Sequence, residues 1–181
     1  MYQQFKSRGE GVGAEVHRFV SGDIAVDFII RFLRQEGVGG EPGIFAVSAD
    51  CRFLNQFTVN PLKAIPEVIF DITRETSAGA RVGISQMDWA IADTGTLAQN
   101  STAVEQRLVS SLPAIHIAIV ATDSILPDMP ALLAKVHPAE CGYLAMITGP
   151  SRTADIERVL TIGVHGPERL IVLFVDDLKG A

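Results

Sequence analysis

Two long apolar runs in the second half of the chain restrict the fold more than any other feature. They are "IHIAIVA" at 115–121 and "RLIVLFVD" at 169–176. Strands that are buried on both faces of a parallel sheet have this continuous Val, Ile and Leu character. A third short strand is expected at 143–148, and segments with helical spacing at 128–137 and 153–164 separate the three. This alternation predicts an α/β fold with a largely parallel sheet flanked by helices.

The first half fits the same architecture with shorter elements. Asp23 reads as the N-cap of an amphipathic helix that Gly37 ends. Further strands are expected at 44–48, 68–72, 81–85 and 88–93, and a helix at 104–112. Apolar spacing over 3–20 predicts a helix, and residues 1–20 are expected as an N-terminal helical arm. With 181 residues and no linker or repeat, we expect one domain over 1–181.

Charge and hydropathy exclude several classes of function. The formal net charge is −6 and the basic residues form no stripe, which argues against nucleic-acid binding. No apolar run approaches the roughly 20 residues that a membrane-spanning helix needs. The polar start "MYQQFKSRGEG" is unlike a signal peptide. These features predict a cytoplasmic protein without a membrane span.

The metal-binding residue types are too scattered to predict a metal or cofactor in this chain. Cys51 and Cys141 lie far apart without CxxC spacing, so neither a disulfide framework nor a zinc or iron–sulfur site is expected. The histidines show no HxH or HExxH pattern. His116 lies inside an apolar strand. We therefore expect a core residue whose ring nitrogens are hydrogen-bonded, in preference to a metal ligand.

Ligands of open α/β sheets bind beyond the carboxyl ends of the strands, which directs attention to three loops. The first is Asp93-Thr94-Gly95-Thr96, the second is Ala121-Thr122-Asp123-Ser124, and the third is Gly149-Pro150-Ser151-Arg152-Thr153. The first loop also imitates the Asp-Thr-Gly-Thr motif of pepsin-type proteases. Those proteases are all-β, so the helical segments of this chain reject that interpretation.

The third loop carries the clearest binding signal. Gly149, Ser151, Arg152 and Thr153 precede a predicted helix, and a helix N-terminus with hydroxyls and a guanidinium suits an anion. The alternative is plain capping, with Ser151 or Thr153 as the N-cap. His165 would lie near the end of the same helix, where it either binds ligand or satisfies the last carbonyls.

Three longer strings resemble a known family. They are "VGISQMDWAIADTGTL", "RLVSSLPAIHIAIV" and "ITGPSRTADIERVLTIGVHGPERLIVLFVDD", which together cover roughly 81–176. They resemble the LUD-domain family, and within it the lactate-utilization protein C branch (LutC/YkgG type). The resemblance implies a fold like that of the NagB/RpiA/CoA-transferase superfamily. It also implies a role in bacterial oxidation of L-lactate to pyruvate beside partner proteins that carry iron–sulfur clusters.

One residue departs from the family pattern. The family usually has Glu-Thr-Gly-Thr where this chain has Asp93-Thr94-Gly95-Thr96. If that carboxylate is catalytic, as a glutamate is in CoA transferases, a side chain shorter by one methylene should slow catalysis, because the carboxylate is displaced. If the carboxylate only orients a loop or a ligand, Asp93 serves equally well.

Two functions therefore remain open at this stage. The first is an accessory component of a lactate-oxidising system that binds a small anion through Thr94, Gly95, Thr96 and the third loop, with a homodimer as one assembly to test. The alternative is a CoA-transferase-like or cyclo-ligase-like enzyme. It would act on a phosphorylated, CoA-linked or carboxylate substrate, with Asp93 as its acid/base group.

Overall fold

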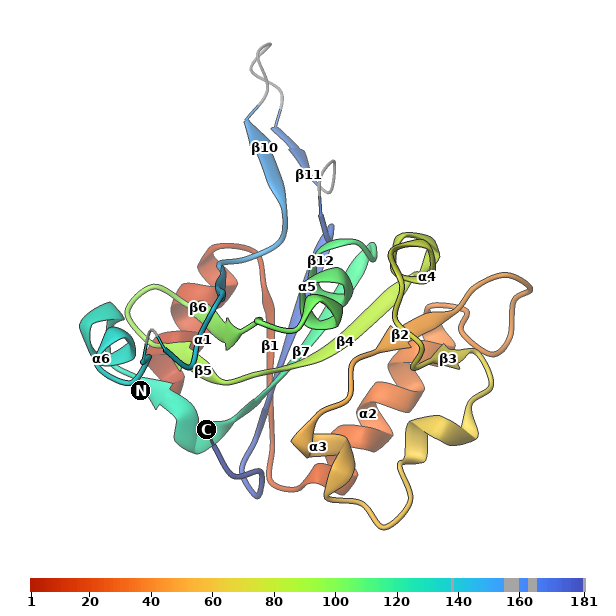
Figure 1. Ribbon diagram of the computed structural model, residues 1–181, viewed down its shortest axis with the longest axis horizontal. Helices are drawn as coiled ribbons and strands as arrows, with labels where there is room; N and C mark the ends of the chain where they lie inside the picture. Colours follow the sequence, from red (N-terminus) through yellow and green to blue (C-terminus); the bar gives the residue numbers. More distant parts are fainter. Residues whose placement is uncertain (138, 155–159, 163–165, 181) are drawn as a thin grey trace.

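A six-stranded parallel sheet forms the centre of the protein (Figure 1). The computed structural model describes residues 1–137, 139–154, 160–162 and 166–180. In spatial order the strands are β1 (Glu15–Phe19), β12 (Arg169–Val175), β7 (Ile115–Ala121), β4 (Val82–Met87), β2 (Ala46–Ser48) and β3 (Val68–Ile69). The sheet confirms the predicted α/β class, and both long apolar runs lie in its middle.

Both faces of this sheet are covered, which explains why β7 and β12 are apolar at almost every position. On β7, Ile117 and Ile119 pack into the core that contains α2 (Gly22–Gln35). Ala118 and Val120 point the other way, into the core that contains Phe5 of α1. Within the described residues no helix has the length and apolar character needed to cross a bilayer.

The remaining helices are short. They are α1 (Tyr2–Gly11), α3 (Arg52–Asn55), α4 (Arg74–Gly79), α5 (Val104–Ser111) and α6 (Met129–Leu133), with 3-10 turns η1 (Pro61–Ala64) and η2 (Thr122–Ser124). The carboxylate of Asp128 caps α6 by accepting the N–H of Ala131 at 2.9 Å. Asp23 is not the N-cap of α2, because that helix begins at Gly22 and Asp177, distant in sequence, accepts the Gly22 N–H at 2.9 Å.

The predicted helical arm over 3–20 is wrong in both extent and placement. The helix ends at Gly11, the chain turns at Gly13 with φ +93°, and the following residues form β1 at the edge of the sheet. The glycines interrupt the helix, and the following residues alternate as a strand requires. Phe5 is completely buried, so α1 packs on the body of the protein.

A second sheet of four strands lies beside α1. Its order is β8 (Ile125–Leu126), β5 (Trp89–Ile91), β6 (Thr96–Asn100) and β9 (Leu144–Ile147). The strand expected at 143–148 therefore exists, but it pairs antiparallel with β6 outside the parallel sheet. Partly exposed residues along β9 agree with this edge position, because a central parallel strand would be buried on both faces.

The helix predicted over 153–164 is also wrong. Its described parts are strands, β10 (Arg152–Ala154) and β11 (Leu160–Ile162), which pair antiparallel with Thr153 opposite Thr161. They form a two-stranded ribbon that projects from the body of the protein (Figure 1). Threonine and isoleucine favour strands, and here that preference outweighs the helical spacing. The helix N-terminus expected at the third loop is therefore absent from the described residues.

Candidate functional site

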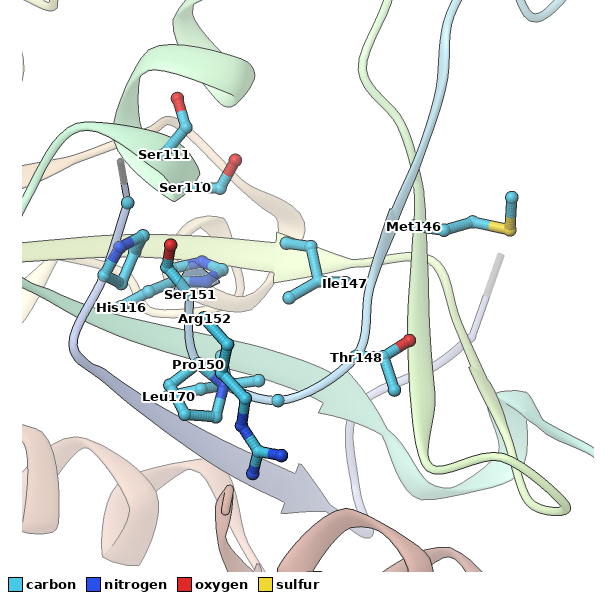
Figure 2. A pocket seen from close by; sticks show the side chains of 13 residues that line it. Ser110, Ser111, His116, Met146, Ile147, Thr148, Pro150, Ser151, Arg152 and Leu170 are labelled. Carbon is cyan, nitrogen blue, oxygen red and sulfur yellow. The ribbon is translucent and has the colours of Figure 1, made fainter. Parts of the chain in front are cut away.

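The third loop opens into a cavity at the amino-terminal end of the parallel strands. We call it the His116 cavity; its volume is about 360 Å³. Its wall includes Ser110, Ser111, His116, Met146, Ile147, Thr148, Gly149, Pro150, Ser151, Arg152, Gly166, Pro167 and Leu170 (Figure 2). His116 and Leu170 are the second residues of β7 and β12, so the site lies opposite the carboxyl edge that the sequence favoured.

A backbone contact fixes the loop at this end of the sheet. The N–H of Ser151 donates to the carbonyl of Pro167, two residues before β12 begins, at 2.8 Å. Gly149 has φ +71°, and a Cβ there would lie 2.5 Å from the carbonyl oxygen of Val12. The loop therefore requires glycine at this turn and packs directly on the end of α1.

His116 is a buried core residue, as expected, but only one of its two ring nitrogens has a hydrogen-bond partner among the described residues. It is fully buried, and its Nε2 lies 2.9 Å from the hydroxyl oxygen of Ser85 on β4. Its Nδ1 is buried and has no hydrogen-bond partner among the described residues. Burial lowers the pKa of His116 to about 4, so the ring is neutral near pH 7. When Ser85 donates to Nε2, Nδ1 carries the ring proton and is a free donor.

Glycine on β4 brings the hydroxyls of α5 to this cavity. Gly83 pairs with His116 in the sheet. A Cβ on Gly83 would lie 2.1 Å from the carbonyl oxygen of Val109, so only glycine lets α5 approach this closely. The result places Ser110 and Ser111 in the same wall as His116, although the sequence offered no motif that marks either serine.

Arg152 has a structural role in addition to lining the cavity. Its Nη2 donates to the carbonyl of Val12, the C-cap of α1, where a positive charge is favourable. In Figure 2 the guanidinium points away from Ser110 and Ser111. Arg152 is the only formally charged side chain among the described residues of the wall, so the cavity has a positive bias.

The first loop belongs to a different cavity. Asp93 and Thr94 are exposed and line a space of about 380 Å³ with Arg8 and Val12, which we call the Asp93 cavity. Gly95 turns with φ +68° against α1, where a Cβ would lie 2.5 Å from the backbone nitrogen of Gly9.

The two predicted loops nevertheless touch. The hydroxyl of Thr96, which is buried, lies 2.8 Å from that of Thr148 at the entrance to the third loop. Both loops pack on the end of α1 but open into separate spaces. The structure thus brings Gly149, Ser151 and Arg152 together and leaves Asp93 outside their cavity.

The two remaining predicted site residues are Thr153 and His165. Thr153 lies in β10 as the partner of Thr161, next to the wall residue Arg152. His165 lies outside the described residues.

The carboxyl edge of the parallel sheet, where the sequence analysis placed ligands, holds a separate polar cavity. It has a volume of about 260 Å³ and is lined by Ala49, Asp50, Cys51, Arg52, Asn55, Gln86, Asp88, Gln99 and Gln106. Burial raises the pKa of Asp88, whose carboxylate accepts the N–H of Asn100 at 2.7 Å. Among the described residues no group of three or more His, Cys, Asp or Glu side chains is arranged to hold a metal ion.

Comparison with solved structures supports the fold. The crystal structure of a DUF162 family protein from Deinococcus radiodurans superposes with a TM-score of 0.65 and 22% sequence identity. The match covers 96% of this chain and 95% of that one.

Curated relatives give higher identity over shorter stretches. Lactate utilization protein C of Geobacillus sp. (strain WCH70) is 41% identical over 104 residues, 54% of this chain and 43% of that protein. Lactate utilization protein C of Anoxybacillus flavithermus is 30% identical over 148 residues, 77% of this chain and 65% of that protein. The Escherichia coli K12 protein named "Uncharacterized protein YkgG" is 34% identical over 104 residues, 54% of this chain and 45% of that protein.

This chain thus spans less than two thirds of the length of each of these relatives. The LUD domain itself matches residues 2–175, nearly the whole chain and every strand of the parallel sheet. The chain therefore belongs to the LUD domain family.

Proposed function

We propose that this protein is a component of a lactate-utilization system and that its His116 cavity binds a small organic anion. The observation that carries the proposal is the composition of the cavity wall. Among the described residues it combines Arg152, four hydroxyl side chains and Nδ1 of His116, which has no partner within that part of the chain. The guanidinium and the ring N–H donate hydrogen bonds, as carboxylate oxygens require. The hydroxyls of Ser110 and Ser111 donate to the carbonyl oxygen of Arg107, so each must turn away from that carbonyl to donate to a ligand.

The names of the relatives supply the metabolic context. Two of the proteins described above are called Lactate utilization protein C. On this basis we propose that the chain acts in the oxidation of L-lactate to pyruvate and that its partners carry the iron–sulfur clusters. Because the chain covers only part of those relatives, the activity and the partners are both part of the proposal.

The binding half of the proposal is tested by calorimetric titration with L-lactate, pyruvate and inorganic phosphate. We expect saturable binding of at least one of the three. Arg152→Gln should weaken it by about tenfold or more, equivalent to about 1.4 kcal/mol. Arg74→Gln, at an exposed position on α4, is the matched control and should bind normally.

Failure of all three anions to bind would contradict the cavity assignment. So would equal affinity in the Arg152→Gln variant. Since Arg152 also contacts the end of α1, the melting temperature of each variant must be measured with the titration, so that loss of binding is separated from loss of folding.

The cellular half needs a different experiment. A strain that lacks the gene and any paralogue should fail to grow on L-lactate, and a plasmid copy should restore growth. A tagged copy purified without oxygen should retain iron–sulfur proteins that mass spectrometry identifies. Normal growth of the deletion strain would reject the metabolic role, whatever the outcome of the titrations.

A further inference from the structure

A smaller cavity lies at the carboxyl edge of the parallel sheet, at the opposite end of β7 and β12 from the His116 cavity. We call it the Trp89 cavity; its volume is about 260 Å³. The loop after β7 contributes Asp123 and Ser124, and the segment after β12 contributes Lys179 and Gly180. Loops beyond the carboxyl ends of parallel strands are where open α/β sheets bind ligands.

Two buried donors in this wall have no acceptor. The indole Nε1 of Trp89 and the hydroxyl of Ser124 are both buried, and neither has a hydrogen-bond partner among the described residues. Ser124 is only 5% exposed. An indole N–H can donate but never accept, so the missing partner is an acceptor. A buried donor without a partner destabilises the folded protein, and a bound acceptor would remove that penalty.

The charges around the cavity favour an anion. Lys135 and Lys179 line it, and they are two of the four lysines in the chain. Neither lysine forms an ion pair within the part of the chain that the structure describes. Among the described residues of the wall Asp123 is the one acidic side chain, so two ammonium groups exceed one side-chain carboxylate there. This local excess contrasts with the net charge of −6 for the whole chain.

The segment that carries Lys179 is held in place on both sides. Leu178 is buried in the core, and the carbonyl of Gly180 accepts from Nη1 of Arg52 at 3.0 Å. A Cβ on Gly180 would lie 2.2 Å from the hydroxyl oxygen of Ser124, so this backbone packs directly against the buried donor. This part of the wall is therefore anchored backbone, and the side chains of Lys135 and Lys179 are exposed beside it.

We propose that the Trp89 cavity is a second anion site, separate from the His116 cavity, that binds an oxyanion. The oxygens of the ligand accept from Trp89 Nε1 and Ser124 Oγ, and the two ammonium groups neutralise its charge. Two lysines favour a doubly charged phosphate group over a singly charged carboxylate. The site therefore takes a phosphate or a phosphorylated small molecule.

Trp89 is the only tryptophan in the chain, so its fluorescence reports directly on this site. The protein is titrated with inorganic phosphate at constant ionic strength, in a buffer that contains no other oxyanion. We expect a saturable change in tryptophan emission. L-lactate in a parallel titration should give no change, or saturate only at concentrations about tenfold higher.

Variants test whether the change in emission comes from phosphate bound in the Trp89 cavity. Lys135→Ala and Lys179→Ala should each raise the half-saturating phosphate concentration, and the double variant should raise it by about tenfold or more. Lys63→Ala, which removes an exposed lysine from η1, is the matched control and should behave as the parent protein. Arg152→Gln should also leave the emission change intact, because that residue lines the other cavity.

Two results would overturn the proposal. One is the absence of a saturable phosphate response in the parent protein. The other is an unchanged response in the double lysine variant, with its fold verified by circular dichroism. Tighter binding of L-lactate than of phosphate would overturn the assignment of ligand class. Because phosphate is also a titrant for the His116 cavity, the variants tell the two sites apart. Binding in the Trp89 cavity is weakened in the double lysine variant and kept in Arg152→Gln, and binding in the His116 cavity shows the reverse.

Discussion

Ser85 and His116 form a hydrogen bond in the middle of the protein, with 2.9 Å between Oγ of the serine and Nε2 of the histidine. Both residues are fully buried, on the neighbouring strands β4 and β7. The histidine must remain neutral there, because burial lowers its pKa from 6.5 to about 4. A neutral ring can accept from Ser85 at Nε2 and still carry a proton on Nδ1.

This pKa predicts how stability depends on pH. Between pH 6.5 and about 4, His116 is protonated in the unfolded chain but neutral in the folded protein. The unfolded state then binds more protons, so the free energy of unfolding falls as the pH falls through this window. We expect His116 to lower it by about 2 kcal/mol between about pH 7.5 and pH 5.

Urea denaturation of the parent protein and of His116→Gln at both pH values measures this contribution. Between these two pH values the free energy of unfolding of His116→Gln should fall by about 2 kcal/mol less than that of the parent protein. His17→Gln is the comparison, since burial also lowers the pKa of the half-buried His17 ring, but to a lesser degree. Equal acid sensitivity in the parent and in His116→Gln would show that the ring is protonated inside the folded protein.

Gly83→Ala should disrupt the packing of α5 on the sheet. The added Cβ would lie 2.1 Å from the carbonyl oxygen of Val109 and 2.8 Å from Cγ of Pro113. Overpacking of this kind typically costs about 1–3 kcal/mol, and we expect the upper end because one obstacle is backbone. Chemical denaturation measures the loss. Gly11→Ala, with nothing within 4 Å of the added atom, should be neutral or slightly stabilising.

Asp93→Asn should leave anion binding in the His116 cavity within about twofold of the parent value, a difference of about 0.4 kcal/mol. Asp93 lines its own cavity with Arg8, while Arg152 lines the other. Calorimetric titration with L-lactate and with phosphate compares Asp93→Asn with Arg152→Gln. If the two variants lose affinity equally, the loops share one functional site despite their separation.

The thiol of Cys51 should react slowly with alkylating reagents. Burial raises its pKa to about 11, so the reactive thiolate is scarce. At about pH 8 the thiolate fraction falls roughly a hundredfold relative to a thiol with a pKa of 9.0. Mass spectrometry of the Cys51 peptide after timed iodoacetamide treatment measures the rate. Unfolding the protein in urea should restore ordinary reactivity, and an equally fast reaction in the folded protein would contradict the burial.

Much of the parallel sheet was predictable because its signal is local. Ile115–Ala121 and Arg169–Val175 are strands within one residue of the expected bounds, since burial on both faces demands apolar residues at consecutive positions. The cap of α6 by Asp128 was predictable for the same reason, because donor and acceptor lie three residues apart.

The errors occurred where distant contacts outweigh local preference. Residues 153–164 have helical spacing, yet Arg152–Ala154 pairs with Leu160–Ile162 as an antiparallel ribbon. Leu144–Ile147 is the strand that was expected, but its partner is β6 and not the parallel sheet. Strand pairing depends on which segments meet in space, and periodicity within one segment carries no record of that.

The sequence by itself determined the α/β class, the family and the two loops that turn on Gly95 and Gly149, because these follow from residue type and spacing. Only the tertiary structure decided which side chains share a cavity. It placed His116 beside Ser110 and Ser151, and Trp89 beside Lys135 and Lys179. Each of these sets comes from segments joined only by the packing of strands and helices. A binding site is defined by distances in space, which packing of the whole chain sets.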